Sequence, residues 1–166
     1  MDELVTATGL SKSTGYRLFP TKNVLTGSYL DPLTSATRAE IGTDIAASRT
    51  PQQALHRIID AIEADVRRPG FRGCPFNNAS IEFRDPDHTA RVAAAAYRRD
   101  LLDRLTTLTT SAAPRRAGAM RSLARQLAAP IDGASTNAAH LDPDGPESDV
   151  LALAHSLINS TTAPAK

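Results

Sequence analysis

Apolar residues recur along most of the chain at spacings of three and four, which is the period of an amphipathic α-helix. The pattern is clearest after Thr50-Pro51-Gln52-Gln53, where a capping hydroxyl, a proline at the first helical position and a glutamine at the third predict a helix start. The stripe of the helix that follows contains Leu55, Ile58, Ile59, Ile62 and Val66. Because strand-like patterns are nearly absent, the sequence predicts an all-α fold.

Three further helices are expected in the first two thirds of the chain. One is long, begins at Thr21-Lys22 and is expected to kink at Pro32. A short helix begins at Pro75 and ends before Asp85-Pro86-Asp87, and a second long helix covers His88 to Ser111.

Two amphipathic segments complete the chain, Ala117 to Leu141 and Pro146 to Ser160, with a loop at Asp142-Pro143-Asp144 between them. Their stripes contain Met120, Leu123, Leu127, Ile131 and Ala134 in the first segment, and Val150, Leu153, Ala154, Leu157 and Ile158 in the second. Pro130 is expected to bend the first segment. Two antiparallel helices form only half of a four-helix bundle, so a second copy of the chain is expected to supply the other half through a two-fold contact. The pattern therefore predicts a homodimer.

Near its start the chain carries a pattern typical of a helix-turn-helix. Gly9 permits the left-handed backbone of a tight turn between two helices, and Ser11 is a natural N-cap for the second of them. The first turns of that helix, which could enter a DNA major groove, contain Lys12, Ser13, Thr14, Tyr16 and Arg17. Lys22 follows at the start of the next helix.

Composition and charge narrow the possible functions. The net charge of +1 is too small for a protein that coats nucleic acid, so any DNA-binding charge must be local, as at Lys12, Arg17 and Lys22. A single cysteine excludes an intrachain disulfide, and no apolar run is long enough to cross a bilayer. The acidic start Met1-Asp2-Glu3 lacks a basic signal region, so a cytoplasmic protein is expected.

Candidate chemistry outside the motif is sparse. No nucleophile, base and orienting residue occur together, so we expect neither an enzyme nor a cofactor. The four histidines lack paired ligand spacing, which argues against a metal site. Cys74 is read as a structural thiol at a helix start, with a reactive or redox-sensing thiol as the alternative.

Two segments resemble the TetR family of transcriptional regulators. The residues that fit the family's helix-turn-helix pattern are Gly9, Leu10, Ser11, Thr14, Tyr16, Phe19, Thr21 and Lys22. The run from Gly73 to Phe83, followed by His88 and an alanine-rich helix, is similar to the regulatory domain of one TetR subgroup. The resemblance implies an N-terminal helix-turn-helix region, residues 1–45, followed by a helical-bundle ligand-binding and dimerisation domain, residues 46–166. The DNA-binding region is expected to lack the family's first helix.

The resemblance also implies a function, that of a ligand-responsive repressor which binds double-stranded operator DNA as a homodimer. The residues expected to contact DNA are Lys12, Ser13, Thr14, Tyr16, Arg17 and Lys22. A small apolar effector is expected among the central helices, in a pocket formed by Phe71, Cys74, Phe76, Ile81, Phe83, Val92 and Tyr97. The alternative is a helical dimerisation or interaction protein with impaired or no DNA binding.

Overall fold

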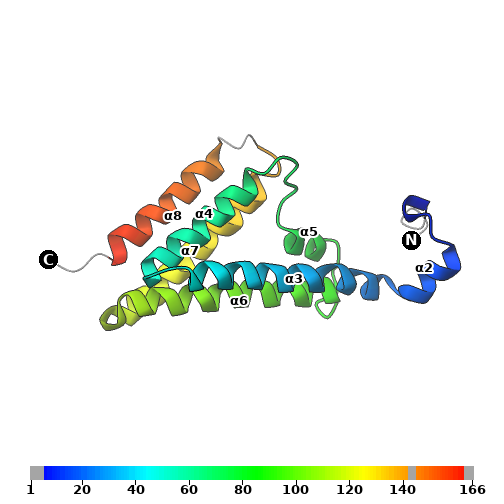
Figure 1. Cartoon of the computed structure of the whole chain (residues 1–166), viewed down its shortest axis with the longest axis horizontal. Helices are drawn as coiled ribbons and strands as arrows, with labels where there is room; N and C mark the ends of the chain where they lie inside the picture. The colour runs from blue at the N-terminus through cyan, green and yellow to red at the C-terminus, as the bar shows by residue number, and fades with distance from the viewer. Residues whose placement is uncertain (1–5, 142–144, 163–166) are drawn as a thin grey trace.

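A computed structural model describes residues 6–141 and 145–162, and every regular element in these ranges is helical (Figure 1). The helices are α2 (Lys12–Leu18), α3 (Lys22–Ala46), α4 (Pro51–Val66), α5 (Pro75–Ile81), α6 (Thr89–Ala112), α7 (Ala117–Asn137) and α8 (Pro146–Thr162), with a short 3-10 turn η1 (Pro114–Arg116) before α7. The predicted all-α fold is confirmed. Residues 1–5 and the predicted loop at Asp142-Pro143-Asp144 lie outside the described residues, so the expectation of a missing first helix stays a prediction.

The helix starts follow from side chains that satisfy free backbone N–H groups. Ser11, Thr21 and Thr50 each adopt an extended backbone, and each side-chain oxygen accepts a hydrogen bond from the amide three residues later. At α4 the amide oxygen of Gln53 also accepts a hydrogen bond from the Arg49 N–H, at 2.8 Å. The sequence predicted these three starts, and the structure confirms them.

Figure 1 shows the helices in two groups. The long helices α3 and α6 lie side by side, and α4, α7 and α8 cross them obliquely as a second group. The short helix α5 lies against α3 and α6, whereas α2 stands at the far end of α3, away from the second group. Helix α3 and helix α7 each continue past their proline, Pro32 and Pro130 respectively.

The main core lies among α4, α6, α7 and α8 of a single chain. The predicted stripes of α4 and α7 face this core, and Leu127 is fully buried in it. The expectation that a second copy must cover the α7 stripe is therefore wrong, because α4, α6 and α8 of the same chain already cover it. On α8 the inward residues are Leu151, Ala154 and Ile158, while the side chain of Leu153, predicted to face inward, is 55% exposed. In the described residues no helix is long and apolar enough to span a membrane.

Candidate functional site

Helix α2 presents a polar, partly basic surface away from the helical bundle. Gly9 has the left-handed backbone that the turn before α2 requires, with φ of +68°. The side chains of Lys12, Ser13, Tyr16 and Arg17 are exposed on α2, and Lys22 is exposed at the start of α3. This arrangement can offer cationic groups to phosphates and a phenol to base edges or backbone.

Two of the residues expected to contact DNA also hold the start of α2. The Ser11 hydroxyl lies 2.9 Å from the hydroxyl of Ser13 and 2.9 Å from that of Thr14, and it accepts a hydrogen bond from the Thr14 N–H at 3.1 Å. Thr14 is only partly exposed. Tyr16 and Arg17 lie outside this cap, and both side chains are exposed.

The end of α3 that carries α2 is packed closely against the start of α6. The Asn23 side-chain oxygen accepts a hydrogen bond from the Thr89 N–H at 2.9 Å. Gly27 is buried, and a Cβ at this position would lie 3.2 Å from the Thr89 methyl group. The close approach of α3 and α6 thus depends on Gly27. This contact attaches the end of α3 that lies next to α2 to the central helices.

A central cavity of about 470 Å³ lies between α3, α4, α5 and α6. Its apolar lining includes Leu33, Ile41, Ile58, Ile62, Val66, Phe71, Phe76, Tyr97 and Leu101. Of the residues expected to bind an effector, it brings together Phe71, Cys74, Phe76 and Tyr97. The volume falls within the range of small-molecule sites, which is about 300–1,000 Å³.

Three of the expected effector residues, Ile81, Phe83 and Val92, do not line the central cavity. Ile81 ends the two-turn helix α5 with its side chain 78% exposed, and Val92 is 51% exposed on α6. Phe83 stacks on the His88 ring, with centroids 3.5 Å apart. The short α5 turns only its first residues, Pro75 and Phe76, towards the cavity.

Burial affects two titratable groups that line the cavity. It raises the pKa of the Cys74 thiol above its usual value, and it likewise raises the pKa of the Tyr97 phenol, with the neighbouring Cys74 and Asp132 acting in the same direction. The Tyr97 ring stacks on Phe76, with centroids 4.4 Å apart. Close by, the Arg98 guanidinium is held by Asp132 and by the Asn77 side-chain oxygen.

We expect Cys74 to react slowly with iodoacetamide at pH 8, because a raised pKa lowers the thiolate fraction at that pH and burial restricts access. Alkylation followed by mass spectrometry should proceed at least about tenfold faster when the protein is unfolded in urea. Equal rates in the folded and unfolded protein would support the reactive-thiol alternative instead.

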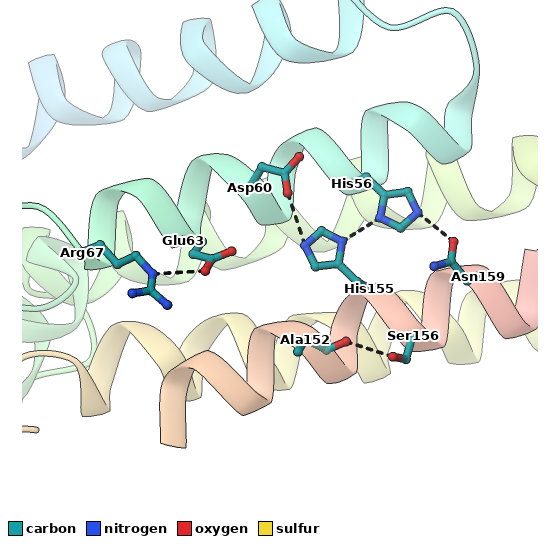
Figure 2. Close-up of polar contacts among 8 residues, drawn as sticks. All are labelled: His56, Asp60, Glu63, Arg67, Ala152, His155, Ser156 and Asn159. Carbon is teal, nitrogen blue, oxygen red and sulfur yellow. Dashed lines mark hydrogen bonds and ion pairs between the residues drawn. The ribbon is translucent and has the colours of Figure 1, made fainter. Parts of the chain in front are cut away.

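The structure joins two histidines that are far apart in the sequence. Figure 2 shows His56 of α4 facing His155 of α8, with their Nδ1 atoms 2.6 Å apart and their rings stacked at 4.9 Å between centroids. His56 Nε2 lies 3.0 Å from the Asn159 side-chain oxygen, and His155 Nε2 lies 3.3 Å from an Asp60 carboxylate oxygen. Sequence spacing gave no signal for this pair, because the two helices meet only in the folded chain.

The contacts of this pair join α8 to α4. The Asn159 and Asp60 side-chain oxygens lie at the two outer Nε2 atoms, and the two Nδ1 atoms face each other between them. No group of three or more metal-ligating side chains occurs in the described ranges.

Comparison with solved structures found matches over nearly the whole chain, two of which come from Streptomyces species. A TetR-family transcriptional regulator from Streptomyces coelicolor matches with a TM-score of 0.89 and 27% identity, covering 98% of this chain and 84% of the other. A protein described as a TetR transcriptional regulator, from Streptomyces avermitilis, matches with a TM-score of 0.79 and 26% identity, covering 97% of this chain and 86% of the other. No protein-family model and no curated protein matches the sequence. Both structural neighbours are regulators rather than enzymes.

Proposed function

The chain has the fold of the TetR-family transcriptional regulators, and from this premise we propose that it is a ligand-responsive repressor in the cytoplasm. The observation that carries the proposal is the exposed surface of α2, which places Tyr16 and Arg17 outward at one end of the molecule. We assign DNA contacts to Lys12, Ser13, Thr14, Tyr16, Arg17 and Lys22. Residues 1–45 form the DNA-binding region with its connecting helix in this proposal, and residues 46–166 form the effector-binding and dimerisation domain, whose central cavity α3 closes on one side.

The proposed homodimer uses the outer faces of α7 and α8. These faces expose small or apolar residues, namely Gly118, Ala119, Ala129, Ala152 and Leu153, beside the exposed Arg121, Arg125 and Gln126 of α7. Small residues permit close approach of helices from two copies, and a two-fold contact would complete a four-helix bundle. This interface leaves the buried stripe of α7 within each subunit.

The effector is proposed to act through α3. Helix α3 contributes Leu33, Thr37 and Ile41 to the central cavity and carries α2 at its other end. Two DNA half-sites lie one helical turn apart, about 34 to 36 Å, so both α2 helices of a dimer must keep a fixed separation. A ligand that tilts α3 would alter that separation and release the DNA.

Binding to the DNA upstream of the protein's own gene tests the function directly. We expect Arg17→Ala to weaken specific binding by about tenfold or more, since its side chain is exposed on α2. Tyr16→Phe, which changes an exposed side chain of the same helix, should weaken specific binding by a smaller factor. Lys22→Ala should weaken binding to specific and shuffled DNA alike and reduce the slope of log K against log salt by about one. Fluorescence anisotropy on labelled duplexes would measure all three.

The matched control is Arg115→Ala, which removes an exposed arginine from η1, at a distance from α2. It should leave affinity unchanged while circular dichroism confirms intact helices in every variant. If the three α2 and α3 variants bind like the parent, the assigned surface is wrong. If the parent binds neither duplex at low salt, the alternative of a helical interaction protein is favoured.

A further inference from the structure

One wall of the central cavity carries an excess of negative charge. Helix α3 contributes the carboxylates of Glu40 and Asp44 to the lining, α4 contributes Asp65, and the turn after α4 contributes Arg68. Arg68 is already paired with Asp65, with 3.1 Å between guanidinium nitrogen and carboxylate oxygen. The charges of Asp65 and Arg68 therefore cancel, and those contributed by α3 do not.

Glu40 and Asp44 are four residues apart, so they lie on the same face of α3 and repel each other. Among the described residues neither side chain forms an ion pair. Arg38, close by on the same helix, is turned to Asp100 of α6 at 3.5 Å. The cavity thus has two carboxylates on one wall whose repulsion a bound cation would relieve.

The rest of the lining fits the body of an organic cation. Aromatic rings of Phe71, Phe76 and Tyr97 face the cavity beside aliphatic side chains, and such rings attract cations as well as apolar groups. The nearby guanidinium of Arg98 is held by Asp132 and Asn77, so it does not offset the charge of the α3 wall.

From this geometry we propose that the effector is a small organic cation, an amine protonated at neutral pH on an aromatic or branched hydrocarbon body. Its ammonium group lies near Glu40 and Asp44, and its apolar body lies against Phe71 and Tyr97. This assignment rests on the proposed role of the central cavity as the effector site. It specifies, in addition, that the ligand carries a positive charge.

Three probes with the same ring system and different charge test the assignment. They are 1-naphthylmethylammonium, the neutral 1-naphthylmethanol and the anion 1-naphthoate, each followed by its own fluorescence in equilibrium dialysis against the full chain. We expect the ammonium to bind about fivefold tighter than the alcohol and the naphthoate to bind weakest, because partly exposed carboxylates give moderate attraction. The ammonium preference should shrink as salt rises from about 0.05 M to about 0.5 M.

Variants that remove one negative charge test which carboxylates cause the preference for the ammonium probe. Glu40→Gln and Asp44→Asn should each reduce the advantage of the ammonium over the alcohol, whereas Asp31→Asn, an exposed change on α3 outside the cavity lining, should keep it. Equal binding of all three probes would overturn the cationic class while leaving the cavity as a ligand site. No binding of any probe at about 1 mM would overturn the effector site itself. An ammonium preference that survives both α3 variants would overturn the assignment to these carboxylates.

Discussion

Leu127→Glu is expected to unfold the helical bundle rather than release folded monomers. Leu127 is fully buried in the core formed by α4, α6, α7 and α8. A carboxylate at this position would be enclosed by apolar side chains with no cation to pair with, which costs several kcal/mol, a large part of the about 5–15 kcal/mol that stabilises a typical domain. Circular dichroism should show loss of helical signal and of a cooperative thermal transition.

Ala129→Glu, on the exposed face of the same helix, is the control for this result. It places the same charge on the outer face of α7, outside the core of the single chain, so the helical signal and the cooperative thermal transition should persist even if the proposed dimer is weakened. A folded, monomeric Leu127→Glu protein would contradict the core that the structure assigns to one chain. It would indicate instead that Leu127 lies in the subunit interface.

Leu153→Glu should have the opposite outcome, a folded chain that no longer dimerises. Leu153 lies on the outer face of α8 with 55% of its surface exposed, and the proposed dimer would bury it against the second copy. Two buried carboxylates near a two-fold axis would repel each other without compensation, at a cost of several kcal/mol. Sedimentation at micromolar concentration should show dimer for the parent and monomer for the variant.

Val92→Glu provides the matched change for Leu153→Glu, since Val92 is an exposed aliphatic residue on α6, away from the outer faces of α7 and α8. It should leave the sedimentation coefficient unchanged. A monomeric parent at micromolar concentration, or a dimeric Leu153→Glu variant, would contradict the interface proposed on α7 and α8.

The positions of the helices could be predicted from the local sequence. The helices against which each one packs could not. The hydroxyls of Ser11, Thr21 and Thr50 act on amides three residues away, so their effect is readable from sequence. The apolar stripe of α7 was also readable. Whether its own chain or a second copy covers that stripe depends on how α4, α6 and α8 pack, which periodicity does not encode.

The candidate site divides in the same way. Phe71, Cys74, Phe76 and Tyr97 reach the central cavity, whereas the exposed Ile81 and Val92 have the same apolar character and could not be told apart by composition. The carboxylates of Glu40 and Asp44 line the same cavity from α3, a helix far from the central segment in sequence, so local pattern gives no signal for them. The contact between His56 and His155 joins positions 99 residues apart, so it exists only through the meeting of α4 and α8.

The unbroken run of α3 has a mechanical consequence. From Ile41 at the cavity to Lys22 beside α2, the helix forms a lever arm of about 28 Å, at about 1.5 Å per residue. A rotation of about 5° about the cavity end would displace the other end by about 2.5 Å, close to the length of a hydrogen bond. In the proposed mechanism, such an arm would convert a small adjustment at the cavity into a shift large enough to break the proposed contacts with DNA.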